Sequence, residues 1–151
     1  MNSKDDMEPK QLLKLALDAA YNAYAPYSQF IVGAAVQLFD DSIFVGANME
    51  NASYGLTSCA EVGALQSAST AGKLSEVKRI AIVGGHSQSN EESGQIVVPC
   101  GRCRQLIYES SILSNTDIAV LCANLNLSSY KEYKISELLP FGFDLKTPSL
   151  E

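Results

Sequence analysis

Three of the four cysteines in the chain are spaced like the ligands of a metal ion. Cys100 and Cys103 form a Cys-x-x-Cys pair at the expected start of one helix, and Cys59 precedes them at the expected start of another. Helix N-termini lower the pKa of a thiol, because they present free backbone N–H groups and the positive end of the helix dipole. Three such thiolates predict a zinc site whose fourth position is open to water.

Glu61 lies two residues after Cys59, at the same expected helix end. A zinc ion lowers the pKa of a bound water towards ~7. A carboxylate beside it can accept the proton of that water and pass it to a substrate. The zinc deaminases combine such a glutamate with a Pro-Cys-x-x-Cys motif and with His or Cys as the first ligand. The pattern therefore predicts a hydrolytic deamination with Glu61 as the acid–base residue.

Other interpretations of these residues are weaker. A redox pair would leave the Cys-x-Glu motif unexplained. A closed structural site would need Cys122 as a fourth ligand, but Cys122 lies in an apolar segment and is expected to be an inert core thiol. His86, the one histidine, follows two glycines in a polar segment and is interpreted as a solvated surface residue.

Composition narrows the possible functions. The 151 residues carry a net charge of −6, which disfavours binding to a nucleic-acid backbone. A single histidine excludes a His-rich metal site and leaves His86 as the only candidate for a Ser-His-Asp triad. Four cysteines are too few for a disulfide scaffold. A hydrophobic fraction of 46% at this length predicts one globular domain, residues 1–151, with residues 1–7 as a loose tail.

The N-terminal residues have no apolar segment typical of a secretory signal, and no stretch is apolar enough to cross a membrane. The sequence therefore predicts a cytoplasmic protein, in which thiols stay reduced and are available to a metal.

Hydrophobic periodicity and turn residues predict alternating helices and strands. The expected helices are 8–24, 59–71, 101–111 and a short turn at 135–139. The expected strands are 32–38, 43–47, 77–83 and 118–123, and the first two form a hairpin. Residues 48–58 and 86–94 are expected to be loops. This order predicts an α/β fold, a three-layer α/β/α arrangement with a mixed β-sheet.

The chain resembles the short-chain cytidine deaminases of pyrimidine salvage over about residues 11–144. The matching segments are APYSQF (25–30), VGAA (32–35), GANMENASYG (46–55), CAE (59–61), PCGRCRQ (99–105) and LLP (138–140). The resemblance implies the cytidine deaminase fold and one zinc ion per subunit. It also implies that Phe30 packs against the pyrimidine, that Asn48 and Glu50 bind the ribose hydroxyls, and that the backbone of Ala60 holds the base edge.

The resemblance further implies an assembly. Short-chain members of the family are homotetramers with shared active sites, so a homotetramer is expected. Tyr54 would lie near the site of a neighbouring subunit, and Phe143 would reach the base bound in another. The expected partner is a small nucleoside, without a nucleic-acid polymer or a membrane.

One difference from the family concerns the charge of the zinc site. The family usually has Arg after Cys-Ala-Glu, where this chain has Val62. Three thiolates around Zn²⁺ leave one net negative charge, which opposes ionisation of a bound water. Our hypothesis is that Arg102, between two of the ligands, supplies the compensating charge. The alternative is an ordinary solvent-facing arginine.

A residue other than Arg after Cys-Ala-Glu, together with the later CGRCRQ segment (100–105), resembles the blasticidin S deaminases. Those enzymes lack the Asn-x-Glu-Asn-Ala-Ser-Tyr segment found here at 48–54. The predicted reaction is therefore the deamination of cytidine and 2′-deoxycytidine to uridine and 2′-deoxyuridine, with a blasticidin-type substrate as the alternative. A polynucleotide deaminase would need a basic surface that this chain lacks. A non-catalytic zinc domain is a second rival, and the intact Glu61 argues against it.

Overall fold

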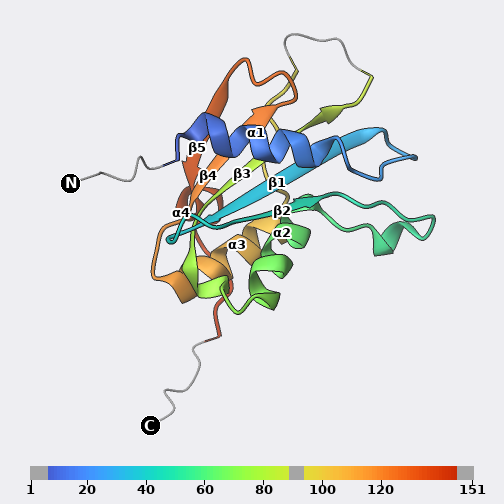
Figure 1. Cartoon of the computed structure of the whole chain (residues 1–151). Coiled ribbons are helices and arrows are strands. Elements are labelled where there is room, and N and C mark those ends of the chain that lie inside the picture. The colour runs from blue at the N-terminus through green and yellow to red at the C-terminus, as the bar shows by residue number, and fades with distance from the viewer. Residues whose placement is uncertain (1–6, 89–93, 146–151) are drawn as a thin grey trace.

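Four apolar strands and one polar strand form a five-stranded mixed sheet with the order β2-β1-β3-β4-β5 (Figure 1). The computed structural model describes residues 7–88 and 94–145. The strands are β1 (Phe30–Leu38), β2 (Ile43–Ala47), β3 (Val77–His86), β4 (Ala119–Asn124) and β5 (Tyr130–Lys134). β3 and β4 are parallel, and the other neighbouring strands are antiparallel. The expected mixed sheet is confirmed.

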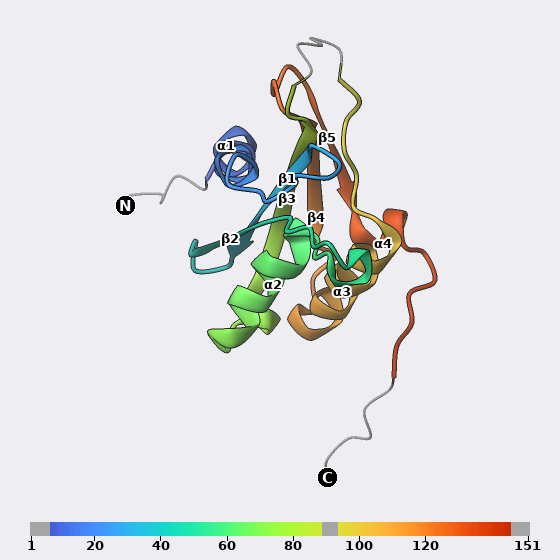
Figure 2. The same ribbon diagram turned by 90° about the vertical axis from the view of Figure 1, so that its right-hand side faces the viewer.

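Helices cover both faces of this sheet, as Figure 2 shows. α1 (Pro9–Ala20) lies on one face, and α2 (Ala60–Thr70) and α3 (Gly101–Ser114) lie on the other. The short elements are the 3₁₀ helices η1 (Tyr54–Leu56) and η2 (Leu74–Glu76), and α4 (Ile135–Leu138). Successive strand residues point to opposite faces, so the sheet carries two apolar clusters, one under α1 and one under α2 and α3. The predicted three-layer arrangement is confirmed.

The predicted boundaries differ from the structure at several ends. The first helix ends at Ala20 rather than near residue 24, because the N–H of Tyr24 bonds to the carbonyl of Asn48 at 3.0 Å and leaves the helical path. β1 begins at Phe30 and β3 continues to His86, so His86 belongs to a strand and not to a loop. The tail predicted at 1–7 lies outside the described residues except for Met7.

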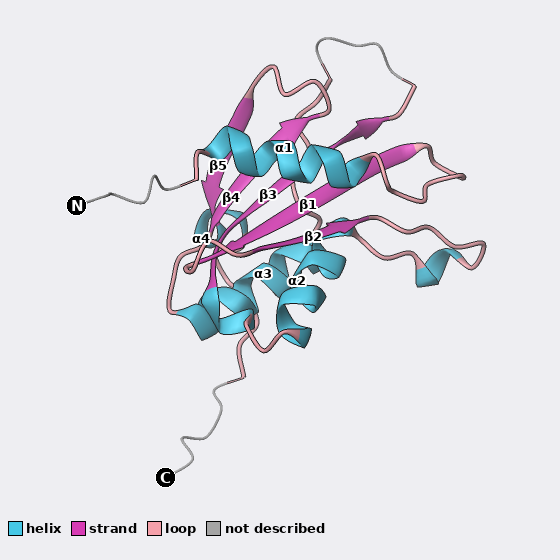
Figure 3. Cartoon of the chain, viewed as in Figure 1, coloured by secondary structure: helices cyan, strands magenta, loops and turns pink. Residues whose placement is uncertain are grey.

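The residue pattern does not predict β5, which Figure 3 draws as a strand at the edge of the sheet. Its sequence, YKEYK, is largely exposed and carries no apolar run. β5 pairs with β4 along one side only, which makes it an edge strand, and charged edge strands are common because they resist pairing with other chains. No helix in the described part of the chain is both long enough and apolar enough to cross a membrane.

Gly46 of β2 sets the position of α2. A Cβ atom at Gly46 would lie 2.3 Å from the carbonyl oxygen of Ala60 and 2.5 Å from the backbone nitrogen of Ala64. Both neighbours are backbone atoms of α2, so neither can move aside as a flexible side chain would. The missing side chain of Gly46 therefore lets the first turn of α2 approach the sheet closely.

Replacing Gly46 with alanine is expected to push α2 away from β2. The expected cost is about 1–3 kcal/mol of stability, as for other overpacked sites. The midpoint of urea unfolding should therefore fall. Gly55→Ala is the matched control, because a Cβ there meets no atom within 4 Å. A Gly46→Ala protein as stable as the Gly55→Ala protein would contradict the close-packing account.

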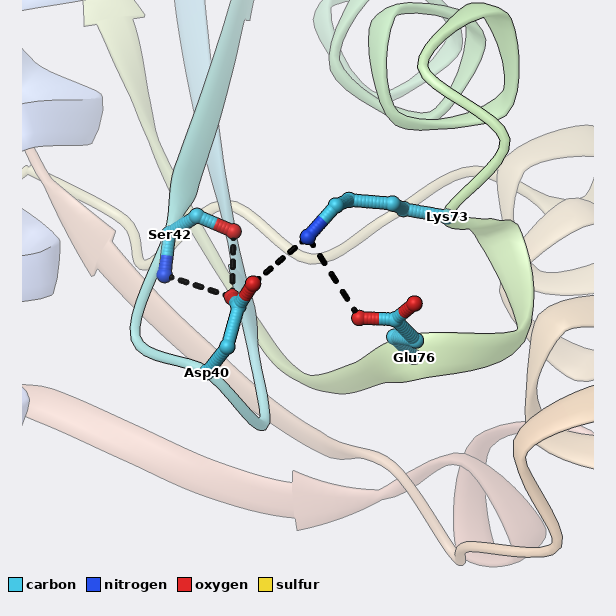
Figure 4. A network of polar contacts seen from close by, with 4 residues as sticks. All are labelled: Asp40, Ser42, Lys73 and Glu76. Atoms are coloured by element: carbon cyan, nitrogen blue, oxygen red, sulfur yellow. Dashed lines mark hydrogen bonds and ion pairs between the residues drawn. The ribbon is translucent and has the colours of Figure 1, made fainter.

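Asp40 links the β1–β2 turn to the segment after α2 (Figure 4). Lys73 forms ion pairs with Asp40 and, at 3.6 Å, with Glu76. The N–H of Ser42 donates to Asp40 at 2.9 Å, and the hydroxyl of Ser42 also donates to it. The hydrogen bond from Lys73, followed by those from Ser42, holds the pKa of Asp40 well below its ordinary value.

This network predicts a pH dependence of stability. Because folding lowers the pKa of Asp40, its ionised form stabilises the fold above the unfolded pKa of ~3.9, and this contribution disappears as the pH falls further. Asp40→Asn should lower the melting temperature at pH 7, and the difference from the wild type should shrink below about pH 4. A melting-temperature difference that stays constant from pH 7 to pH 3 would contradict this account.

Candidate active site

Two helix N-termini bring three cysteines together on the face of the sheet that α2 and α3 cover. Cys59 is the N-cap residue of α2, and Cys100 is the N-cap residue of α3. Cys103 lies in the first turn of α3 and is fully buried. The three sulfur atoms lie within 4.8 Å of one another, as a group that could hold a metal ion. The predicted helix starts and the predicted cluster are both observed.

The donor set fits zinc. Soft thiolates select zinc among the common divalent ions, and Zn–S bonds of ~2.3 Å in a tetrahedron place sulfur atoms about 3.8 Å apart. The observed spacing therefore permits one ion to contact all three sulfurs. Cys122, the fourth cysteine, is outside the group and fully buried in β4, where burial raises the pKa of its thiol to about 12. Its interpretation as a core thiol agrees with this position.

The three thiols differ in their surroundings. Burial raises the pKa of Cys59 and that of Cys103, and for Cys103 the nearby Glu61 charge raises it further. Burial also opposes ionisation of Cys100, but hydrogen bonds from the backbone N–H and the thiol of Cys103, from the Cys59 thiol and from the backbone N–H of Arg102 together outweigh it and lower the pKa of Cys100. The N-terminus of α3 thus favours a thiolate at Cys100, as expected for a helix start.

Glu61 is buried beside the cysteines, with only 4% of its surface exposed. It belongs to the first turn of α2. Burial raises the pKa of its carboxyl, against the lowering effects of its own backbone N–H and of the Cys103 thiol. A raised pKa makes a carboxylate a stronger proton acceptor, which suits a general acid–base residue. Ala60, directly before it, is fully buried at the same helix start.

Glu50 is held in place by the segment that precedes β1. The backbone N–H groups of Tyr27 and Ser28 donate to its Oε2 at 2.9 and 3.2 Å, and the hydroxyl of Ser28 donates to its Oε1. The Ser28 hydroxyl is the main cause of a lowered pKa at Glu50. The carboxylate is therefore ionised, and Oε1 keeps acceptor capacity for a hydroxyl group of a ligand.

Asn48 bridges the start of β1 to the end of β2. Its Oδ1 accepts the N–H of Val32 at 2.8 Å, and its Nδ2 donates to the carbonyl of Phe30 at 2.9 Å. The Asn48 side chain thus also holds the start of β1, a role that the sequence pattern does not indicate. An amide has two donor hydrogens and two acceptor lone pairs, so one of each remains for a ligand.

Two cavities border Phe30 and Glu50, and neither is lined by Glu61 or by the clustered cysteines. The larger, of about 780 Å³, is bordered by Phe30, His86 and the segment leading to Cys100. The smaller, of about 320 Å³, is bordered by Glu50, Tyr54, Tyr27, Ser28 and Thr57. Ser28 borders both. Phe30 and Glu50 therefore stand at adjoining hollows of one surface.

Tyr54 and Phe143 are exposed, by 75% and 67% respectively. Tyr54 packs edge-on against Tyr27, with ring centroids 5.8 Å apart. The backbone of Phe143 is fixed by two hydrogen bonds with the Gln105 side chain, at 2.8 and 3.0 Å. The structure thus places Tyr54 beside Glu50, whereas Phe143 joins neither the cysteine group nor the two cavities.

Arg102 is exposed, and its side chain makes no ion pair or hydrogen bond within the described residues. Its backbone N–H does act on Cys100, as described above. Val62 is 5% exposed and packs in the core. The Arg104 guanidinium donates hydrogen bonds to the carbonyls of Pro99 and Leu138, at 2.8 and 3.1 Å. Charge compensation by the Arg102 guanidinium stays a prediction.

Sequence reasoning overlooked two residues at this site. Ser28 fixes the Glu50 carboxylate, but a serine in a turn segment carries no signal of such a role. His86 is exposed, as predicted, yet its ring contacts Phe30. That contact depends on the register of β1 against β3, which the residue pattern does not determine.

Comparisons with known proteins decide the family. The model of the "cytidine and deoxycytidylate deaminase zinc-binding region" matches residues 7–118, a span that includes Glu61 and all three clustered cysteines. The chain belongs to this deaminase family. A cytidine deaminase of Halalkalibacterium halodurans is 43% identical over 137 residues, which cover 91% of this chain and 95% of that protein. One from Mycobacterium tuberculosis is 40% identical over 104 residues, or 69% and 72% of the two chains.

Solved structures of the family have the same fold. The crystal structure of cytidine deaminase from Burkholderia pseudomallei superposes with a TM-score of 0.78 at 40% identity, covering 91% of this chain and all of that chain. That of the enzyme from Mycobacterium tuberculosis gives a TM-score of 0.72 at 33% identity, over 93% and 100% of the two chains. The zinc-binding motif of this family therefore lies on the family's own fold.

Proposed function

We propose that the protein is a zinc-dependent cytidine deaminase that converts cytidine and 2′-deoxycytidine to uridine and 2′-deoxyuridine, releasing ammonia. The observation that carries the proposal is a cluster of three thiols at two helix N-termini with the buried Glu61 beside it. The family match and relatives named cytidine deaminase support it. Cys59, Cys100 and Cys103 are the proposed zinc ligands.

A zinc ion held by Cys59, Cys100 and Cys103 would lower the pKa of a water bound to it. Glu61 would accept one proton from the attacking water and deliver it to N3 of the cytosine as the water oxygen adds to C4. Glu61 then moves the second proton to the exocyclic amino group. The C4–N bond breaks, ammonia leaves and the base remains as uracil. Two protons of one water thus end on N3 and on the departing ammonia, which balances the hydrolysis.

The neighbouring residues orient the nucleoside in this proposal. Phe30 offers an aromatic surface to the base, and the backbone of Ala60 lies at the helix start that carries Glu61. The remaining acceptor of Glu50 and the remaining donor and acceptor of Asn48 suit sugar hydroxyls. A net charge of −6 suits an uncharged nucleoside better than a nucleotide or a polymer.

A panel of substrates tests the proposed reaction. The zinc-loaded protein is assayed with cytidine, 2′-deoxycytidine, CMP and blasticidin S by the loss of ultraviolet absorbance. Cytidine and deoxycytidine should be turned over, and CMP should be a poor substrate. Preference for blasticidin S would overturn the substrate assignment. Turnover of none would favour a non-catalytic zinc domain.

The proposal includes a homotetramer in the cytoplasm, serving pyrimidine salvage. Large apolar side chains are exposed on the loop around η1 and after α4. Exposed apolar patches are typical of surfaces that bind another protein chain. The exposed side chains are Met49, Tyr54, Leu56, Phe141 and Phe143. In a tetramer these segments would be covered, and Phe143 would contribute to a neighbouring site. Light scattering on the purified protein gives the subunit number directly.

Arg102→Ala tests whether the guanidinium balances the charge of the zinc site. If it does, the variant should bind zinc about 10- to 100-fold more weakly, as expected for loss of a residue that tunes a metal ligand. The readout is competition with a chelating dye. Arg102→Lys, which keeps the charge, should restore most of the affinity. Wild-type zinc affinity and a wild-type rate in the alanine variant would make Arg102 an ordinary surface arginine.

A further inference from the structure

His86 and Phe30 stand directly opposite each other on the antiparallel strands β3 and β1. Their ring centroids are 5.0 Å apart and their planes meet at 89°. This is the edge-to-face arrangement that aromatic rings prefer. Opposed side chains of an antiparallel pair project from the same face of the sheet, so the imidazole meets the phenyl ring across the two strands.

The ring pair lies on the same face of the sheet as the cysteine group. Val32 and Ile82 belong to the apolar cluster under α2 and α3. Phe30 precedes Val32 by two residues and His86 follows Ile82 by four, so both project to that face. α2 and α3 also carry Cys59 and Cys100 as their N-cap residues.

Hydrogen bonds fix the backbone of Phe30 but not its ring. Its N–H donates to the Ser28 hydroxyl at 3.0 Å, and its carbonyl accepts from Asn48 at 2.9 Å. Just outside the pair, the N–H of Ser87 donates to the carbonyl of Gln29 at 2.9 Å. Both rings border the cavity of about 780 Å³, which offers the Phe30 side chain space for other rotamers.

We propose that His86 is a positioning residue that holds the Phe30 ring ready to pack against the nucleoside base. The inference rests on the proposed function, because it assigns Phe30 to the base. His86 touches no reacting atom in this account. Without His86, the Phe30 ring has more rotamers available. Ordering the ring when the base binds then reduces the binding free energy. The effect therefore falls on KM and not on kcat.

Steady-state kinetics of the zinc-loaded enzyme test this role. His86→Ala should raise the KM for cytidine about 3- to 10-fold, the range expected for an aromatic pair, with kcat changed less than about 2-fold. His86→Phe keeps a ring against Phe30 and should restore the KM. Gln88→Ala is the matched control, because Gln88 is exposed and borders the same cavity two residues further along the chain.

A double-mutant cycle shows whether His86 acts through Phe30. In a Phe30→Ala background, His86→Ala should have no further effect on KM, because its partner is already gone. The single histidine also gives one resolvable imidazole proton signal, which should shift in Phe30→Leu. An unchanged KM in His86→Ala, no rescue by His86→Phe, or additive effects in the cycle would each overturn the inference. Lack of cytidine turnover by the wild type would instead overturn the proposed function, and the inference with it.

Discussion

Glu61→Gln is expected to keep zinc and to lose about 10²- to 10⁴-fold in kcat for cytidine. Glutamine has nearly the same shape as glutamate but cannot accept and return a proton, and general acid–base catalysis contributes a factor of this size. Glu61 is the buried carboxyl beside the cysteine group, so the proposed mechanism gives both proton transfers to it. The measurement is kcat together with zinc content by atomic absorption.

Glu109→Gln is the matched control for this prediction. Glu109 is exposed on α3, so the change removes the same charge and leaves the site intact. Its kcat should stay within about 2-fold of the wild type. A Glu61→Gln enzyme with substantial turnover would remove Glu61 from the acid–base role. Loss of zinc from the variant would show that Glu61 supports the metal site instead.

Cys100→Ala is expected to abolish both zinc binding and activity. Cys100 is the exposed member of the group and caps α3, so removing its sulfur takes away a ligand with little loss of core packing. A zinc ion left with two protein ligands should dissociate, and the zinc content should fall from about one per chain to near zero. Activity should fall with it to the background rate.

Cys122→Ala distinguishes a ligand from a core thiol. Cys122 is buried in β4 and lies outside the group, so its loss should leave zinc content and kcat unchanged. It should cost about 1–2 kcal/mol of stability, because it leaves a small cavity. Full zinc in Cys100→Ala, or loss of zinc in Cys122→Ala, would contradict the assignment of the ligands.

Much of the site was predictable because it depends on short-range patterns. Cys59 and Cys100 each precede a Pro-free stretch, and both prove to be N-cap residues of helices. The strands β3 and β4 are apolar on both faces, and helices cover both, as the order of the predicted elements indicates. Gly72 directly follows the C-cap residue of α2, and its φ of 73° is one that glycine adopts readily at a helix end.

The features that the sequence does not predict depend on pairing between residues far apart in the chain. β5 has no apolar run and is largely exposed, so nothing in its composition marks it as a strand. Ser28 and Glu50 meet only because the turn before β1 folds back onto the segment after β2. The contact between His86 and Phe30 needs the exact register of β1 and β3, since a shift by one residue would place the two rings on opposite faces.

Metal reconstitution tests the central claim most directly. The wild-type protein is stripped with a chelator and titrated with zinc while uridine formation from cytidine is followed. The rate should rise linearly with zinc and level off at about one ion per chain, with one ammonia released for each uridine. Full activity in the stripped protein, or no activity once each chain holds one zinc ion, would contradict the account of a three-cysteine zinc deaminase.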